Sequence, residues 1–314
     1  MTDDVPDDIV RPFAVEPLAV RGRIVRLGAS LDAILARHDY PQPVARVLGE
    51  AAALAVLLGS SLKFEGQFQL QTKTDGPVEM IVVDFNAPDC LRAYARFDAD
   101  KVAALGSGPA STAALVGNGM LAMTIDQGSE MNRYQGIVAL DSSGFEQAAQ
   151  EYFNQSEQIP TRVRLAVAQE IVPEGSIYRA GGIMVQYLPS SSEKLRLEEK
   201  PPEAELSSDL WDEALALTNT VEDHELVDPD LSSERLLYRL FHERGVRVFE
   251  EQAVRESCSC SRERVVTMIR RFSQDDRDAM VGDDGKIGVT CEFCSRHYDF
   301  TPNEIEPAGE TKND

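Results

Sequence analysis

Positive charge is scarce in this sequence: 31 Lys and Arg stand against 53 Asp and Glu, for a formal net charge of −22. Nucleic acids and anionic membranes are bound through clustered Lys and Arg, so the sequence predicts neither as a partner. Long hydrophobic runs are also missing, since the longest, at 51–59, has about half the length that spans a bilayer. The first residues are acidic and polar, unlike the basic and then apolar start of a signal peptide. We therefore expect a soluble cytoplasmic protein.

The sequence also lacks a phosphate-binding loop and has few cysteines, and both facts limit the reactions that the protein can carry out. A phosphate-binding loop is missing, because Val-Gly-Asn-Gly at 116–119 lacks the Lys-Ser/Thr pair of such loops and is better interpreted as a turn. Cysteine is rare, with five in 314 residues, and four of the five follow residue 257. In a reducing compartment, paired cysteines favour a metal site or a redox switch over permanent disulfides. The fifth, Cys90, lies far from the others beside an Asn-Ala-Pro-Asp turn, and we expect it to be a bystander.

Residues 9–189 show the patterns of one α+β domain with a mainly antiparallel sheet and packed helices. Period-two alternation predicts strands at 68–72 and 78–85, joined by a turn at Asp75-Gly76. Further strands of the same sheet are expected at 20–27, 91–97, 120–125, 134–140, 162–167 and 182–188. Three helices are expected: one capped by Ser30 and running through His38, one opened by Pro43 and running to about Leu62, and one at 145–158.

The composition changes after this domain. Between residues 193 and 234, fourteen acidic residues stand against three basic ones, with leucines at intermittent helical spacing. A segment of such high charge is not expected to form a deep core of its own. We interpret residues 190–257 as an acidic, mostly helical, metastable linker that leans on its neighbours. An inert solvated linker is the alternative.

The four clustered cysteines form two close pairs, Cys258 with Cys260 and Cys291 with Cys294. Four thiols in this arrangement can fill the tetrahedral coordination of one Zn²⁺ ion, and the same pairing allows two short disulfides. The module at 258–306 has few apolar residues, and domains of this size usually need a metal or disulfides to fold. Zinc would contribute about 10–16 kcal/mol of folding free energy, against about 5–15 kcal/mol for the net stability of a whole domain.

Spacing alone leaves several roles open for these cysteines. A static zinc ribbon that binds a protein or nucleic acid partner, a redox switch and a thiol–disulfide oxidoreductase all use paired cysteines. Arg262, Arg264 and Arg296 are close in sequence and could lower thiol pKa values, which would favour reaction with oxidants. His297 could replace one thiol as a ligand, although a solvent-facing or core histidine is the more common case.

Longer motifs carry a resemblance to a known family. Cys-Ser-Cys-Ser-Arg-Glu-Arg at 258–264 and Cys-Glu-Phe-Cys-Ser-Arg-His-Tyr at 291–298 closely resemble the tail signature of the redox-regulated 33 kDa chaperonin family. The resemblance extends from about residue 9 to residue 305, and the sequence departs from the family in an acidic, proline-containing stretch at 193–205 and at both ends. Other family landmarks follow in order at 20–22, 62–64, 75–77, 116–119, 133–136, 152–153, 156–158, 160–162, 180–182 and 237–242.

The resemblance implies an ATP-independent holdase, not an enzyme, that binds unfolded or oxidatively damaged proteins and prevents their aggregation under heat or oxidative stress. It implies a core chaperone domain at 9–189, the linker at 190–257 and a zinc-binding redox-switch domain at 258–306. In the reduced, inactive state Cys258, Cys260, Cys291 and Cys294 would hold zinc. Oxidation would form Cys258–Cys260 and Cys291–Cys294 disulfides, release zinc and unfold the tail and linker. A homodimer is expected on activation.

Overall fold

The structure is a computed structural model of the chain, and it describes residues 5–61, 66–106, 110–127, 133–141, 143–173, 175–188 and 202–305, with the side chains of 202–208 left out. It divides into two compact units, Met1–Glu256 and Ser257–Asp314. The predicted helix end at Leu62 and the proline-containing stretch up to residue 201 lie outside the described residues. The separation of a linker from a core domain within the first unit stays a prediction.

The strands of the first unit form two six-stranded sheets, which confirms the predicted α+β class with mainly antiparallel pairing. Every pairing in them is antiparallel except that of β12 with β5. Sheet A has the order β10-β1-β2-β9-β8, with β11 also on β1, and sheet B has the order β12-β5-β4-β3-β6-β7. The strands of sheet A are β1 (Ile9–Val15), β2 (Val20–Leu27), β8 (Thr161–Val172), β9 (Gly175–Tyr187), β10 (Arg247–Val248) and β11 (Gln252–Ala253). Those of sheet B are β3 (Gln67–Thr74), β4 (Val78–Asn86), β5 (Cys90–Phe97), β6 (Gly119–Asp126), β7 (Tyr134–Leu140) and β12 (Arg255–Glu256).

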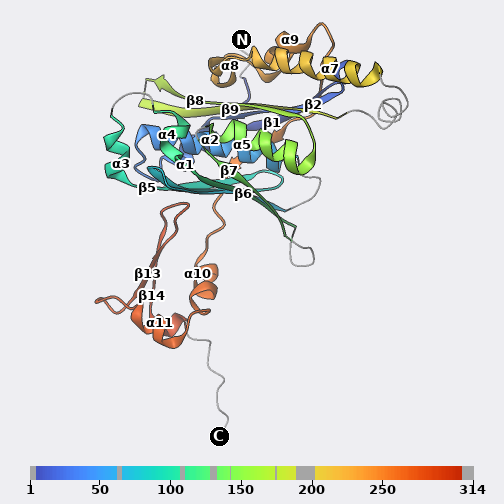
Figure 1. The fold of residues 1–314 in the computed structure, drawn as a ribbon. Coiled ribbons are helices and arrows are strands. Elements are labelled where there is room, and N and C mark those ends of the chain that lie inside the picture. Colours follow the sequence, from blue (N-terminus) through green and yellow to red (C-terminus); the bar gives the residue numbers. More distant parts are fainter. Residues whose placement is uncertain are drawn as a thin grey trace. The chain divides into compact units, whose positions relative to one another are not determined.

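The expectation of a single sheet is wrong, because a helical layer separates two (Figure 1). Helix α2 (Gln42–Gly59) contacts strands of both sheets, and 78% of it is buried. It is long and apolar enough to cross a membrane by length and composition, but it occupies the position of a core helix. The neighbouring short elements are η1 (Glu16–Leu18), α1 (Ala29–Leu35), α3 (Ala99–Ala104), α4 (Thr112–Val116), α5 (Gly144–Tyr152) and the π-helical turn η2 (Phe153–Glu157).

Both ends of the first predicted helix and the end of the third differ from the structure. Helix α1 ends at Leu35 rather than at His38. Ser30 does not cap α1 but lies inside it, and its hydroxyl donates to the carbonyl of Val254. The carboxylate of Asp8 instead accepts from the backbone N–H groups of Gly28 (2.9 Å) and Ser30 (3.1 Å), which satisfies the open end of the helix. The helix predicted at 145–158 is α-helical only to Tyr152 and continues as η2.

From residue 202 onward, where the structure describes it, the acidic segment forms three helices over the outer face of sheet A: α7 (Pro202–Asn219), α8 (Asp223–Val227) and α9 (Ser233–Phe241) (Figure 1). Leu236, Leu237 and Phe241 are fully buried, and the ring of Phe241 lies 5.9 Å from that of Phe13 on β1. Their hydrophobic cluster includes strand residues of sheet A as well as helix residues. The apolar residues of this segment therefore pack on the sheet, and its folding depends on that sheet.

Glu50, on α2 between the sheets, provides a pH-dependent test of this packing. Burial is the main cause that raises its pKa from 4.5 to about 7; the nearby Glu146 and Asp223 add to this, while the Thr112 hydroxyl bond (2.6 Å) and Arg46 oppose it. Between pH 4.5 and about 7 the folded protein holds a proton that the unfolded chain has released. The free energy of unfolding therefore falls as pH rises through this window and changes no further above it.

We expect Glu50→Gln to stabilise the protein at pH 8 by up to about 3 kcal/mol, because the amide cannot ionise and still accepts from Thr112. Urea unfolding at pH 8 and near pH 4 measures the effect, and the gain should vanish at the lower pH. An equal gain at both pH values would contradict this origin of the instability.

The second unit is small. It contains α10 (Arg262–Ile269), α11 (Gln274–Ala279), the hairpin of β13 (Ile287–Thr290) and β14 (His297–Phe300), and α12 (Pro302–Ile305). Its buried apolar cluster consists of Val265, Ile269, Ile287, Phe300 and Ile305. A core of this size offers little burial against the conformational entropy of more than forty ordered residues.

Candidate metal centre

The first cysteine pair lies immediately before helix α10. Ser261 caps this helix, with its hydroxyl accepting from the backbone N–H of Arg264 at 3.3 Å. Cys260 precedes the cap residue, so it lies next to the positive end of the helix dipole, which favours a thiolate.

The second pair lies in the turn between β13 and β14. The N–H of Cys291 donates to the carbonyl of Arg296 (3.0 Å), and the N–H of Ser295 donates back to the carbonyl of Cys291 (2.8 Å). Ser295 has a left-handed backbone, with φ of 55°, which closes the turn. This local folding sets Cys291 and Cys294 on one side of a compact knuckle.

The structure brings all four predicted cysteines together. Their Sγ atoms lie within 4.8 Å of one another, and the thiols are free and partly buried. Two close Sγ–Sγ contacts join the pairs: Cys258 to Cys291 at 3.7 Å and Cys260 to Cys294 at 3.3 Å. A tetrahedral ion with Zn–S bonds of about 2.3 Å needs sulfur atoms roughly 3.8 Å apart. The donor set and its spacing therefore fit Zn²⁺.

The thiols of the cluster differ in acidity. Burial raises the pKa of Cys260, but hydrogen bonds from the Tyr298 hydroxyl (3.2 Å) and from the three other thiols outweigh it and bring that pKa to about 7. Burial raises the pKa of Cys294 to about 12, and also raises the pKa of Cys258. Of these three thiols Cys260 ionises most readily, as a metal ligand or an attacking nucleophile must.

Tyr298 is the functional residue that sequence analysis missed. It lies on β14, four residues after Cys294, and its hydroxyl reaches back to the first cysteine pair. A side chain that donates to a ligand sulfur fixes that ligand and tunes its basicity. A tyrosine on the strand that follows a cysteine knuckle is the signal that could have found it.

The other residues near the cysteines take different positions. Arg262 pairs with Glu304 (2.7 Å) and Arg264 donates to the carbonyl of Ser259 (2.8 Å), whereas the charge of Arg296 interacts with Cys260 and Cys294. His297 is exposed, and its ring bonds to Thr290 and Asp299 rather than joining the sulfur cluster.

Cys90 belongs to the first unit, on β5, and is not part of the sulfur cluster. Its S–H donates to Asp89 at 3.2 Å, and burial raises its pKa. A thiol of raised pKa is a poor nucleophile, which agrees with a minor chemical role.

The sequence matches one family of known proteins over nearly its whole length. The family model described as Hsp33 protein matches residues 8–301. The chain belongs to the Hsp33 family. It is 46% identical over 309 residues to the 33 kDa chaperonin of Caulobacter vibrioides, which covers 96% of this chain and 99% of that one. The 33 kDa chaperonin of Ectopseudomonas mendocina is 36% identical over 300 residues, with 95% and 94% covered.

The fold agrees with this assignment. The solved structure of the 33 kDa chaperonin (heat shock protein 33 homolog) of Thermotoga maritima matches with a TM-score of 0.74 at 21% identity, covering 95% of this chain and 96% of that one. Hsp33 relatives are named chaperonins rather than enzymes, so membership of the Hsp33 family supports a chaperone role.

Proposed function

We propose that this chain is a redox-regulated, ATP-independent holdase that is inactive when reduced and zinc-bound. The observation that carries the proposal is the cluster of four free thiols within 4.8 Å in a unit with a small core, in a member of the Hsp33 family. Residues 9–189 form the core chaperone domain, 190–257 the metastable linker and 258–306 the zinc-binding redox switch.

In the reduced state Cys258, Cys260, Cys291 and Cys294 hold the metal. Zinc supplies folding free energy of about 10–16 kcal/mol to a unit whose own core is too small to fold alone. The Tyr298 hydroxyl and the start of α10 stabilise the negative charge of the thiolates.

Oxidation reverses this. Each disulfide, Cys258–Cys260 and Cys291–Cys294, forms when two thiolates lose two electrons to one molecule of oxidant, such as hypochlorite, which is reduced to chloride. Two equivalents therefore consume all four ligands and release zinc. The second unit then loses its largest stabilising contribution and unfolds.

Unfolding reaches the linker through the chain itself. The segment between α9 and Cys258 contains β10 and β11, which pair with β1 of sheet A, and β12, which pairs with β5 of sheet B. Once α7–α9 leave sheet A, the apolar residues beneath them are exposed, and large exposed apolar patches bind other chains. The net charge of −22 keeps such a species soluble by self-repulsion.

The partners that follow are unfolded or oxidatively damaged client proteins in the cytoplasm, together with a second copy of the chain in an activated homodimer. Nucleic acid and membranes are not partners, and no catalytic turnover is involved. Nucleic acid is excluded because the chain is strongly acidic and would be repelled by phosphate groups.

Oxidation with hypochlorite tests the proposal. The reduced protein loaded with zinc should release about one zinc per chain, measured with a coloured chelator, while the free-thiol count falls by four. In parallel it should gain the ability to suppress aggregation of a heat-denatured client protein. Equal protection by the reduced form would overturn the redox switch, and steady turnover of a disulfide substrate would favour an oxidoreductase.

A further inference from the structure

Helix α8 and the loop after it approach sheet A unusually closely at Gly181 on β9. A Cβ atom at Gly181 would lie 2.0 Å from the carbonyl oxygen of Leu226 and 2.7 Å from its carbonyl carbon. Since real Cβ atoms essentially never come so close to a backbone atom, only glycine permits this contact. At Gly181 it is therefore the main chain of α8 that packs directly against the sheet.

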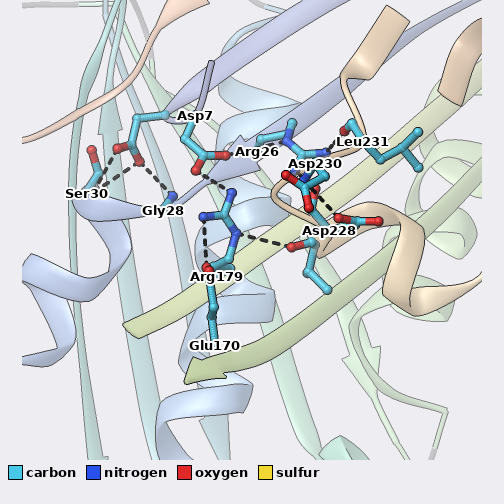
Figure 2. A network of polar contacts seen from close by, with 11 residues as sticks. Asp7, Arg26, Gly28, Ser30, Glu170, Arg179, Asp228, Asp230 and Leu231 are labelled. Carbon is cyan, nitrogen blue, oxygen red and sulfur yellow. Dashed lines mark hydrogen bonds and ion pairs between the residues drawn. The ribbon is translucent and has the colours of Figure 1, made fainter. Parts of the chain in front are cut away.

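Two arginines of sheet A bind the same main chain next to this glycine. Arg26 on β2 donates to the carbonyl oxygens of Leu231 (2.6 Å) and Asp228, and Arg179 on β9 donates to that of Val227 (3.1 Å) (Figure 2). Arg26 lies directly opposite Gly181 in the β2–β9 register. Three hydrogen bonds are thus made to main-chain carbonyl oxygens, which every polypeptide has; among the linker side chains, that of Asp228 adds an electrostatic interaction with Arg26.

The sheet itself holds the two guanidinium groups in place. Asp7 pairs with both arginines, and Glu170 on β8 pairs with Arg179 at 3.3 Å (Figure 2). The arginines are 2% and 7% exposed. Glu170 belongs to β8 and Asp7 to the chain just before β1, so Arg179 keeps both carboxylates as hydrogen-bond partners after α8 leaves, and Arg26 keeps its ion pair with Asp7 at 3.5 Å.

Apolar surface surrounds these polar groups. Leu226 is 1% exposed and packs in the cluster that contains Ile24, Ala166 and Ile183 of sheet A. Fixed donors to backbone carbonyls beside an apolar floor are what is needed to bind a short polypeptide segment of almost any sequence.

We propose that Arg26, Arg179 and Gly181, here called the carbonyl cradle, form a polypeptide-binding site of the activated protein. Residues 226–231 are its internal occupant in the resting state, and a short apolar segment of an unfolded client takes their place once the linker has left. The inference rests on the proposed function and adds where on the core the client main chain binds.

Direct binding to the wild-type protein is the first test. A fluorescent peptide with the sequence of residues 221–232 should bind the oxidised protein at least about tenfold more tightly than the reduced protein, in which the cradle is occupied. Unlabelled peptide should also displace labelled, reduced and carboxymethylated α-lactalbumin, a permanently unfolded client. If α-lactalbumin binds but a large excess of peptide does not displace it, the cradle is not the client site.

Variants provide the second test. Gly181→Ala fills the space of the Leu226 carbonyl, and Arg179→Gln removes a charged donor, so each should weaken α-lactalbumin binding by the oxidised protein about tenfold. Asp223→Ala is the matched control, because it cuts the Arg164 contact (2.8 Å) from the linker side and leaves sheet A unchanged. It should loosen the linker but keep wild-type client affinity.

The outcomes separate the two proposals. Wild-type client affinity in a folded, oxidised Gly181→Ala protein would overturn the carbonyl cradle and leave the holdase proposal standing. Failure of the oxidised wild-type protein to bind any unfolded client would overturn both. Circular dichroism of each variant checks that it folds, and the peptide experiment decides the matter if a variant does not.

Discussion

Cys291→Ser is expected to abolish zinc binding and unfold residues 257–305, while the first unit stays folded. The substitution removes one of four thiolates whose Sγ atoms lie within 4.8 Å, and the unit has only a five-residue apolar cluster among its described residues to replace the lost metal. The free energy at stake is about 10–16 kcal/mol, more than the net stability of most domains. Zinc content and the protease resistance of the C-terminal unit measure the effect.

Cys90→Ser is the matched control for this experiment. It makes the same chemical change in the first unit, outside the sulfur cluster, and should leave zinc content unchanged. Under the proposed function the reduced Cys291→Ser protein also protects clients without oxidant. A static zinc ribbon would lose its fold in the same variant but gain no such activity, and a protease-resistant C-terminal unit without zinc would contradict the metal-dependent fold.

The cysteine site could be predicted from sequence because its information is local. Cys258 and Cys260 are two positions apart and Cys291 and Cys294 three, so the members of each pair are close in the chain itself. What the spacing does not contain is the arrangement of the pairs, in which Cys258 lies near Cys291 and Cys260 near Cys294. That arrangement depends on how the start of α10 meets the β13–β14 turn, which is a matter of tertiary packing.

Eight strands of the first unit were predictable for the same reason, whereas β1, β10, β11 and β12 and the division of the strands into two sheets were not. Period-two alternation fixes which residues of a strand share a face but not which sheet the strand joins. The feature of the sequence that indicates two sheets is the helix at 42–59, because it is apolar almost all round and needs packing on both sides. The Asp8 cap of α1 was out of reach, since the carboxylate comes from twenty residues upstream.

The carbonyl cradle was also beyond sequence reasoning. Arg26 shares a strand face with Ile24, and an arginine in such an alternation is normally taken for a solvent-facing residue. Its burial and its partners arise only when residues 226–231, some two hundred positions later, cover that face. Contacts between main chain and distant side chains leave no periodic trace in a sequence.

Phe241→Ala should make the protein active without oxidation. Phe241 is fully buried against Phe13 and closes the linker onto sheet A. Truncating a buried phenylalanine costs about 3–5 kcal/mol, which is large for a segment whose stability depends on packing against its neighbour. The reduced, zinc-loaded variant should therefore suppress client aggregation and show faster amide exchange in α9, while its zinc content stays at one per chain.

Tyr238→Ala is the matched control, since this aromatic residue lies on the same helix but is 65% exposed. It should leave both exchange and client protection as in the wild type. If Phe241→Ala loosens α9 but still needs oxidant to protect clients, linker release is not the activating event, and the surface that binds clients must be sought in the unfolded zinc unit. If it protects without oxidant, the cysteines act only through the linker, because activity then appears with all four thiols still reduced.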